Sequence, residues 1–470
     1  MRLVCATFVT RPLEKAASDL AAMMRAQENS VSARKQVHRA SARGAGNSWS
    51  LMASTIAVEE LRVGMFIQLD GGWLSHPFPL SSFRIASHEQ ISTLRELGLR
   101  QLRWVPEKSD LPPDAACLGG AQAAADAAAR AAQSEVQRLR QELQAQRGAA
   151  QHCERQHAEA ATAWREASDA VSARPQEAAR TTERLTRAIL DKMLVADDIG
   201  IRLVPGGGDR AAAHALNVTI VSLLIARTLG VSEAELMDLG IGALMHDVGK
   251  ADVPERFRHA EEGFNANELN AYRDHVVKGV ALGQRMGLSA GALRVLAQHH
   301  EHADGSGFPL KIAGERITMA SRVVALVNRY DNLCNPQART LALTPHEAVS
   351  VLFAQGRQRF DATVLNAFIR MMGVYPAGSL VQLTDDRFAI VVGVNSSRPL
   401  KPRVLVHDAH VPRHEALVLD LERCPDLGIR RSLPAAKLPA PAIEYLDPRP
   451  RVAYYFEPLV REVQGEELAA

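Results

Sequence analysis

The residues SEAELMDLGIGALMHDVGK, at positions 232–250, carry the strongest fold signal in this 470-residue chain. Ser232 followed three residues later by Glu235 is a capping box, a pattern that starts an α-helix. Apolar residues then recur at helical spacing up to Met245, and a His-Asp pair follows them. The stretch predicts a buried helix whose C-terminal end presents side chains that can bind a metal.

The same character extends over residues 180–376, which read as one helix after another. Thr344-Pro345-His346-Glu347 is a second helix start, with Thr as the N-cap, Pro at the first helical position and Glu at the third. These agreeing signals predict a mainly α protein whose central part is an all-α domain.

The N-terminal part of the chain divides at about residue 52. Residues 1–52 lack periodicity and are expected to be poorly ordered; because Met52 precedes the first patterned segment, residues 1–51 could also be an over-extended reading frame. Residues 53–112 predict a small α+β module with short strands, a helix from Ser87 to Gly98, and a last strand at 102–105.

Residues 113–179 are rich in Ala, Gln, Glu and Arg, which favour helix. Val136, Leu139 and Leu143 have coiled-coil spacing, so this helical spacer could pair in a homodimer. A solvated single helix or a flexible linker is an equally good reading.

Residues 377–470 predict a β-rich C-terminal extension. Strand patterns at 380–383, 388–394, 403–406, 416–421 and 452–456 are separated by Pro, Asp, Gly and Asn turns.

Composition excludes several classes of protein. The net charge of +2 gives no field that would attract DNA, RNA or an anionic membrane. The five cysteines are scattered without a CxxC pair, which is typical of free thiols in a reducing compartment. No apolar run reaches the roughly 20 residues that span a bilayer. We therefore expect a cytoplasmic protein without a membrane partner.

The helical domain contains a concentration of metal-binding residue types. They are His214, His246, Asp247, His275, His299 and His300, with Lys250 one turn after His246. Imidazoles with a carboxylate and no thiolate suit Fe, Mn or a similar divalent ion. The set exceeds what one metal needs, so two ions are expected, an arrangement that can hold both the attacking and leaving oxygens of a phosphodiester.

His246-Asp247-Val248-Gly249-Lys250 together with His299-His300-Glu301-His302-Ala303-Asp304-Gly305-Ser306-Gly307-Phe308-Pro309 resembles the HD-GYP family over residues 180–373. The segment 55–106 resembles a small domain of unknown function found ahead of such domains, through Leu61-Arg62-Val63-Gly64-Met65 and Trp73-Leu74-Ser75-His76-Pro77-Phe78.

The resemblance implies a phosphodiesterase that hydrolyses cyclic di-GMP to linear pGpG or GMP through a metal-activated hydroxide. Asp247 would bridge two ions and Lys250 would steady the hydroxide or a phosphate oxygen. The implied metal ligands are His214, His246, Asp247, His275, His299, His300 and Asn328. The implied substrate-binding residues are Lys250, Asp304, Gly305, Gly307, Phe308, Pro309, Asp331 and Arg339, although Asp304 is better explained as a turn residue.

The sequence departs from the family pattern at four places. Phe308 replaces a tyrosine, Asn328 replaces a metal-ligating Asp, and Arg339 is the nearest cation where members carry an Arg-Pro-Tyr-Arg-like segment. Arg210 stands where some members have a Glu that supports a third metal, so a trinuclear site is not expected. The alternative hypothesis is a catalytically weak or inactive HD-GYP protein that senses cyclic di-GMP or serves as a scaffold for signalling proteins. An HD hydrolase acting on another phosphoester is a third reading.

Overall fold

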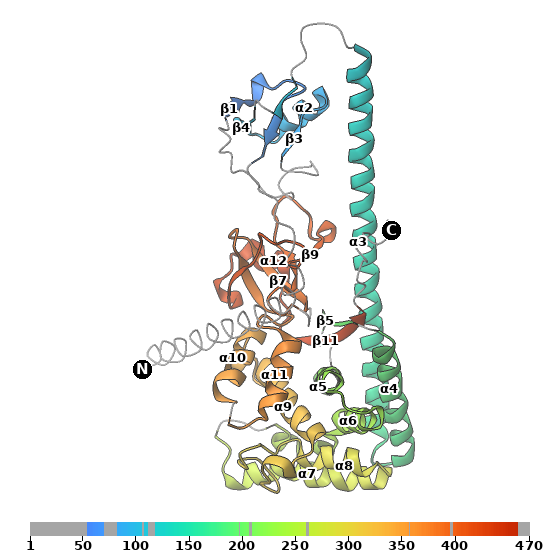
Figure 1. Ribbon diagram of the computed structural model, residues 1–470. Coiled ribbons are helices and arrows are strands. Elements are labelled where there is room, and N and C mark those ends of the chain that lie inside the picture. The colour runs from blue at the N-terminus through green and yellow to red at the C-terminus, as the bar shows by residue number, and fades with distance from the viewer. Residues whose placement is uncertain are drawn as a thin grey trace, which may run out of the picture. The chain divides into compact units, whose positions relative to one another are not determined.

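The computed structural model describes residues 54–69, 82–105, 108–110, 118–196, 198–205, 209–259, 263–356, 358–394 and 398–458 (Figure 1). The segment 1–52 and the Trp73–Phe78 motif lie outside these residues. Contacts divide the chain into two compact units, one within His38–Ala145 and the other containing Gln146–Ala470. The division falls inside the expected spacer.

The N-terminal unit is a small α+β module. Its antiparallel sheet has the order β1-β4-β2-β3, formed by β1 (Ser54–Ala57), β2 (Phe66–Gln68), β3 (Ser82–Arg84) and β4 (Gln101–Trp104). Helix α2 (His88–Glu96) supplies Leu94 to the core, where this side chain is fully buried with Ile67. Ser87 caps the helix as predicted. The Gln90 side chain accepts from the amide of Ala86, whereas in a complete capping box it would accept from the amide of Ser87.

The central region is the predicted bundle of helices. They are α4 (Pro175–Val195), α5 (Arg210–Thr228), α6 (Glu233–Met245), α7 (Ala266–Met286), α8 (Ala290–Gln298), α9 (Met319–Cys334), α10 (Pro345–Gln355) and α11 (Ala362–Met372). The capping boxes at Ser232 and Thr344 are both present. Helix α5 is buried on all sides from Ala215 to Ala226 and contacts α6 and α9. This central helix brings the other helices to one site.

An antiparallel sheet completes the second unit. The sheet order is β10-β6-β7-β5-β11, and β8 joins β7 to β9. The strands are β5 (Ile199–Val204), β6 (Leu380–Leu383), β7 (Phe388–Val394), β8 (Arg403–Val406), β9 (Val418–Asp420), β10 (Ile429–Ser432) and β11 (Ala453–Pro458). The expected C-terminal strands are present, and a short helix, α12 (Ala440–Leu446), was not expected.

Strand β5 corrects the expectation that residues 180–376 contain helices alone. Its sequence IGIRLV is a short, mostly apolar run, which periodicity cannot assign to helix or strand. In the structure it pairs antiparallel with β11, with Tyr454 opposite Leu203. The two strands run side by side next to α5 in Figure 1, so the C-terminal chain is part of the helical unit.

The Ala-rich segment forms one long helix, α3 (Leu118–Ala170). Its C-terminal part packs on the helical region, where Cys153, Ala160 and Ala167 are buried and the Trp164 indole N–H donates to the Leu244 carbonyl at 2.8 Å. In its N-terminal half, Val136 is 46% exposed. The segment is therefore a solvated helix at one end and a packed one at the other.

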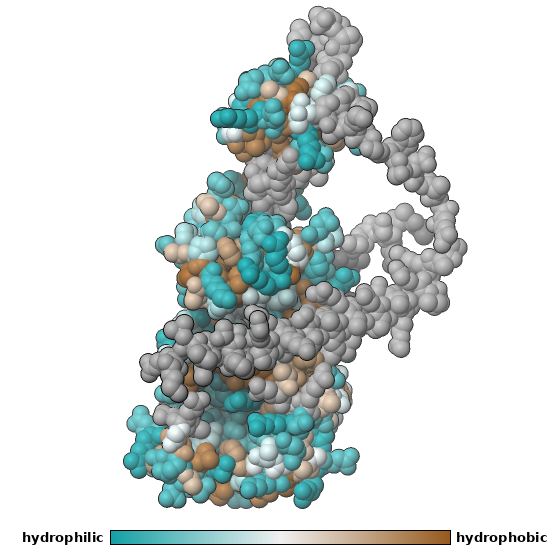
Figure 2. Space-filling model, turned by 90° about the vertical axis from the view of Figure 1, so that its left-hand side faces the viewer, coloured by the Kyte–Doolittle hydropathy of each residue, from teal (hydrophilic) through white to brown (hydrophobic). Residues whose placement is uncertain are grey.

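One described helix, α5, has the length and apolar character of a membrane span. Most of it is buried inside the protein, which is equally typical of a core helix. The face of the helical region shown in Figure 2 is mainly hydrophilic, with hydrophobic residues scattered among polar ones. Scattered exposed apolar residues are ordinary on a protein surface.

Candidate metal centre

The candidate ligands come from four helices, of which α6 packs on α5 and α8 packs on α6 and α7. His214 lies in the first turns of α5, His246 and Asp247 end α6, His275 lies in α7, and His299 and His300 end α8. The close approach of α7 to the turn η3 (Val248–Asp252) depends on Gly249. A Cβ there would lie 2.0 Å from the His275 carbonyl oxygen, so only glycine allows this contact. The glycine of the HDVGK stretch thereby brings His275 to Asp247.

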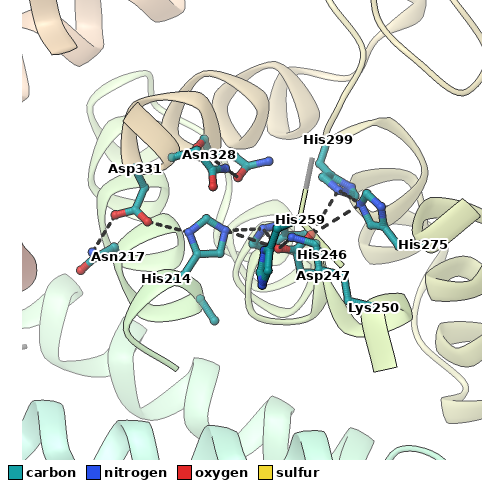
Figure 3. Close-up of polar contacts among 12 residues, drawn as sticks. His214, Asn217, His246, Asp247, Lys250, His259, His275, His299, Asn328 and Asp331 are labelled. Atoms are coloured by element: carbon teal, nitrogen blue, oxygen red, sulfur yellow. Dashed lines mark hydrogen bonds and ion pairs between the residues drawn. The ribbon is translucent and has the colours of Figure 1, made fainter. Parts of the chain in front are cut away.

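Asp247 lies between two groups of histidines (Figure 3). Its Oδ2 is 3.5 Å from Nε2 of His214 and 3.6 Å from Nε2 of His246. Its Oδ1 is 3.5 Å from Nε2 of His275 and 3.9 Å from Nε2 of His299. His300 belongs to the second group, because one of its ring nitrogens lies within 4.8 Å of the ligand atoms of Asp247, His275 and His299. One carboxylate therefore presents one oxygen to each group.

The orientation of four imidazoles is set by acceptors behind them. Nδ1 of His246, His275 and His299 each lies 2.6–2.8 Å from the carbonyl oxygen three residues earlier in the chain. Nδ1 of His214 lies 2.6 Å from Oδ2 of Asp331. A carbonyl can only accept, so Nδ1 of His246, His275 and His299 carries a proton, and in these neutral rings Nε2 is a lone pair facing the site.

Ring nitrogens face each other in both groups. Nε2 of His214 is 3.1 Å from Nε2 of His246, and Nε2 of His275 is 3.3 Å from Nε2 of His299. Two lone pairs cannot hydrogen-bond to each other, so the neutral rings of His275 and His299 leave room for a cation between them, whereas a protonated His214 can donate to His246. Oδ1 of Asp247 is also buried without a hydrogen-bond partner. Converging lone pairs and an unpartnered carboxylate oxygen suit divalent metal ions.

The electrostatics of the cluster agree with this geometry. Burial lowers the pKa of His246 to about 4 and lowers the pKa of His299 and His300 well below the usual value. Burial also lowers the pKa of His214, but its hydrogen bonds to Asp247 and Asp331 outweigh that effect and raise it to about 9. For Asp247, burial raises the pKa, while Lys250 and the surrounding imidazoles bring it well below its usual value. His246, His299, His300 and Asp247 are therefore in the forms that metals require, whereas His214 must release a proton to bind one.

The loop that follows His300 packs closely against the His-His-Glu turn. A Cβ on Gly307 would lie 2.5 Å from the Glu301 Cα and from the His300 carbonyl oxygen, so the loop packs directly on the His-His-Glu turn. The buried Glu301 accepts from the Leu310 and Lys311 amides at 2.6 and 3.1 Å and ties the far end of the loop down. Phe308 stacks on the His300 ring with centroids 4.4 Å apart.

The remaining predicted loop residues shape the backbone. Asp304 is exposed and its Oδ1 accepts from the Ser306 amide at 2.9 Å, which is the turn role favoured for that position. Gly305 has a positive φ of 75°, and the Phe308–Pro309 peptide bond is cis. Phe308 is the loop residue that the described contacts bring directly to the histidines.

Asn328 is buried on α9, the helix that also carries Asp331. Its Oδ1 accepts a hydrogen bond from Asn332 Nδ2 at 2.7 Å, and its carbonyl accepts from the same group at 2.9 Å. Figure 3 shows Asn328 above the row of labelled histidines. A metal ion bound by Asn328 would compete with Asn332 for the amide oxygen of Asn328.

Asp331, one of the residues expected at the substrate, hydrogen-bonds to a histidine of the cluster. Asp331 is 1% exposed. Its Oδ2 contacts Nδ1 of His214, and its Oδ1 accepts hydrogen bonds from Asn217 and Asn335. It is therefore a positioning residue for His214, and we no longer expect it to contact substrate. Arg339 lies in η6 (Arg339–Leu341), and the described contacts do not bring it to the histidine cluster.

Some residues near the cluster were not singled out from the sequence. The Tyr272 ring lies 4.9 Å from His275 and 6.0 Å from His300, and the Arg273 guanidinium lies 5.3 Å from the Phe308 ring. Position 272 is three residues before His275, on the same face of α7, which is the signal that could have identified it.

Arg210 and His259 form a second group of polar side chains beside the cluster. The guanidinium of Arg210 lies 3.2 Å from both ring nitrogens of His259. Burial, together with the charges of Lys250 and Arg210, lowers the pKa of His259 to about 4. Arg210 thus adds a cation to this side of the site.

This arrangement of helices, histidines and a shared aspartate suits divalent metal ions. Residues 167–364 match the family model described as "HD domain", and residues 54–182 match the "Domain of unknown function (DUF3391)". Residues 167–364 are thus similar to the HD domain family, and the resemblance to HD-GYP proteins is confirmed.

Curated relatives carry related names. The chain is 28% identical to the cyclic di-GMP phosphodiesterase PA4108 of Pseudomonas aeruginosa, over 76% of this chain and 85% of that protein. It is 33% identical to the cyclic di-GMP phosphodiesterase response regulator RpfG of Xanthomonas campestris pv. campestris, over 32% and 40%. It is 27% identical to the 3'3'-cGAMP-specific phosphodiesterase 2 of Vibrio cholerae, over 33% and 30%. The chain thus spans most of the first relative and less than half of the other two.

Proposed function

We propose that this protein hydrolyses cyclic di-GMP to linear pGpG or GMP as a metal-dependent phosphodiesterase. The observation that carries the proposal is the position of Asp247, with one carboxylate oxygen facing each of two histidine groups. A structural core has no use for three fully buried imidazoles, those of His246, His275 and His299, whose ring nitrogens converge on one carboxylate, because polar groups are costly to bury.

Two divalent ions, Fe or Mn, are the proposed cofactors. One group, His214 and His246, and the other, His275, His299 and His300, would each hold an ion with Asp247 shared between them. When bound, such ions lower the pKa of a water molecule and offset charge on phosphoryl oxygens.

The chain's own residues prepare the site for an anionic substrate. Lys250 lies 2.5 Å from Oδ2 of Asp247 and 5.9 Å from the Tyr272 ring, so its ammonium is held at the edge of the cluster. There it is positioned to donate to a phosphoryl oxygen. Arg210 and Arg273 add positive charge on other sides, which favours a phosphodiester over a neutral ligand.

The names of the relatives support cyclic dinucleotides as the substrate class. PA4108 and RpfG are named for cyclic di-GMP, and the Vibrio cholerae relative is named for 3'3'-cGAMP. We rank cyclic di-GMP first because the relative that shares most of the chain carries that name. Both nucleotides share the phosphodiester chemistry and differ in one base, so a direct comparison separates them.

The test is turnover of cyclic di-GMP and of 3'3'-cGAMP by protein loaded with Mn(II) or Fe(II), alongside the metal content. We expect two metals per chain and faster turnover of cyclic di-GMP, with both activities lost in Asp247→Ala. Metal-loaded protein that cleaves neither nucleotide faster than Asp247→Ala would reject the proposal.

Asn328 favours a second candidate, a weak or inactive enzyme that binds cyclic di-GMP as a sensor or a scaffold for signalling proteins. Its amide carries no charge, and its oxygen already accepts from Asn332. Nucleotide binding with a micromolar or tighter Kd in the absence of turnover would support this candidate. A homodimer through the spacer and a cytoplasmic location stay predictions.

A further inference from the structure

The C-terminal strand reaches the candidate metal centre through a short chain of buried hydrogen bonds. The first link joins Oδ2 of Asp331 to Nδ1 of His214 at 2.6 Å. In the second, Oδ1 of Asp331 accepts from Nδ2 of Asn217 at 2.7 Å and from Nδ2 of Asn335 at 2.9 Å. Figure 3 shows the part of this chain that runs from Asn217 through Asp331 to His214.

The same two amides hold the backbone at the start of β11. The Val452 carbonyl accepts from Nδ2 of Asn217 at 3.1 Å and from Nδ2 of Asn335 at 2.9 Å. The Val452 amide donates to Oδ1 of Asn335 at 3.0 Å, and the Tyr454 amide donates to Oδ1 of Asn217 at 2.8 Å. β11 is the edge strand next to β5, so the two asparagines take the place of a further strand.

Every donor of these two amides is used. Each NH₂ group has two hydrogens, one directed to Asp331 and one to Val452, and each amide oxygen accepts from the strand backbone. The three linking side chains are nearly inaccessible, with exposures of 1% for Asn217, 1% for Asp331 and 7% for Asn335. A shift of β11 would leave buried groups unpaired, which is costly.

We propose that the start of β11, at Val452 and Tyr454, is a positioning element for the metal ligand His214. It acts through Asn217 and Asn335 on Asp331, and Asp331 sets the orientation of the His214 ring. The inference rests on the proposed metal site but not on turnover. It makes the C-terminal region an integral part of one half of the site, and the half formed by His275, His299 and His300 has no such link among the described contacts.

A Co(II) titration of the purified, metal-free full chain tests the proposal, with the ligand-field absorbance as the readout. Loss of a residue behind a ligating histidine typically costs about 10- to 100-fold in metal affinity. We expect Asn335→Ala and Asn217→Ala to weaken one binding step by that factor and to leave the other unchanged. His275→Ala identifies the unaffected step.

The matched control is Tyr454→Phe. It removes the 2.9 Å contact between the Tyr454 and Tyr330 hydroxyls but keeps the backbone amide that donates to Asn217. We expect Tyr454→Phe to lower Tm without changing either Co(II) step. Equal Co(II) affinities in wild type and in both folded asparagine variants would overturn the proposal.

Hydrogen exchange of the unaltered chain provides a test that needs no variant. Coupling is reciprocal, so a metal that binds more tightly when β11 is in place must also hold β11 in place. We expect Co(II) to slow exchange in the peptide that contains 452–454 more than in β6 of the same sheet. Equal protection of the two would overturn the proposal. Intact coupling without hydrolysis of any cyclic dinucleotide would reject the proposed function and retain this inference.

Discussion

The ammonium of Lys250 lies 2.5 Å from Oδ2 of Asp247, three residues earlier in the chain. That same oxygen faces His214 and His246, so Lys250 is directed at one half of the cluster. Lys250 lies in the short turn η3, which Asp247 precedes, and if either side chain moved away the other would be a partly buried charge without its partner. Lys250 is thus fixed where a substrate oxygen would meet the metals.

Lys250→Gln should separate turnover from metal binding. Removing a preorganised positive group that stabilises developing charge costs about 100- to 1000-fold in kcat. We expect that loss for cyclic di-GMP with the metal content unchanged, measured by steady-state kinetics and elemental analysis. Lys278→Gln is the control, because Lys278 donates to the Asp252 carbonyl at the exposed surface. Equal kcat in Lys250→Gln and wild type would contradict the assigned role.

Asn328→Asp should strengthen metal binding. The change restores a negative charge of nearly the same shape, and Asn332 can still donate to the new carboxylate. Ligand charge is a main determinant of affinity for hard cations, and we expect about a tenfold tighter Mn(II) dissociation constant. Competition with a chromophoric chelator measures it. An unchanged or weaker constant would mean that position 328 does not face the metal.

Removal of metal should lower thermal stability. A ligand that binds only the folded state adds about 2.7 kcal/mol at a concentration 100 times its Kd. We expect chelator-treated protein to unfold at a lower Tm and Mn(II) to restore it, as measured by calorimetry. Asp247→Ala should show little response to Mn(II). An identical Tm with and without metal would count against a metal centre.

Gly307→Ala should disrupt the loop that covers the cluster. Its methyl group would lie 2.5 Å from backbone atoms of the His-His-Glu turn, and overpacking of this kind costs about 1–3 kcal/mol. We expect a lower Tm and loss of turnover, since Phe308 would move from the His300 ring. Gly148→Ala is the control, because a Cβ there meets nothing within 4 Å. Equal effects of the two changes would refute the packing argument.

His157 should make the fold sensitive to acid. It is 5% exposed, its Nε2 has no hydrogen-bond partner, and burial lowers its pKa. Below the unfolded pKa of about 6.5 the unfolded chain binds a proton that the folded chain does not, so stability falls as pH falls. Between pH 8 and pH 5.5, we expect the Tm of metal-free His157→Leu to fall less than the Tm of metal-free wild type. The exposed His414 gives the control His414→Leu, and matching pH profiles for wild type and His157→Leu would contradict this account.

The sequence by itself determined the elements and the chemistry of this protein. Capping boxes at Ser232 and Thr344 and apolar spacing predict the helices because those signals are local to one turn. The His-Asp and His-His patterns identify the ligand types for the same reason. The family resemblance added the expectation that these separated patterns share one site.

Tertiary structure alone decided how those residues are used. Asp331 looked like a substrate residue, but packing of α9 against α5 places it behind His214, where its charge orients a ring. β5 could not be told from a helix because its apolar run carries no period, and only its pairing with β11 defines it. The contacts of Asn217 and Asn335 with Val452 join residues 117 or more positions apart. No local pattern encodes such contacts, because burial and long-range hydrogen bonding arise only when the whole core has formed.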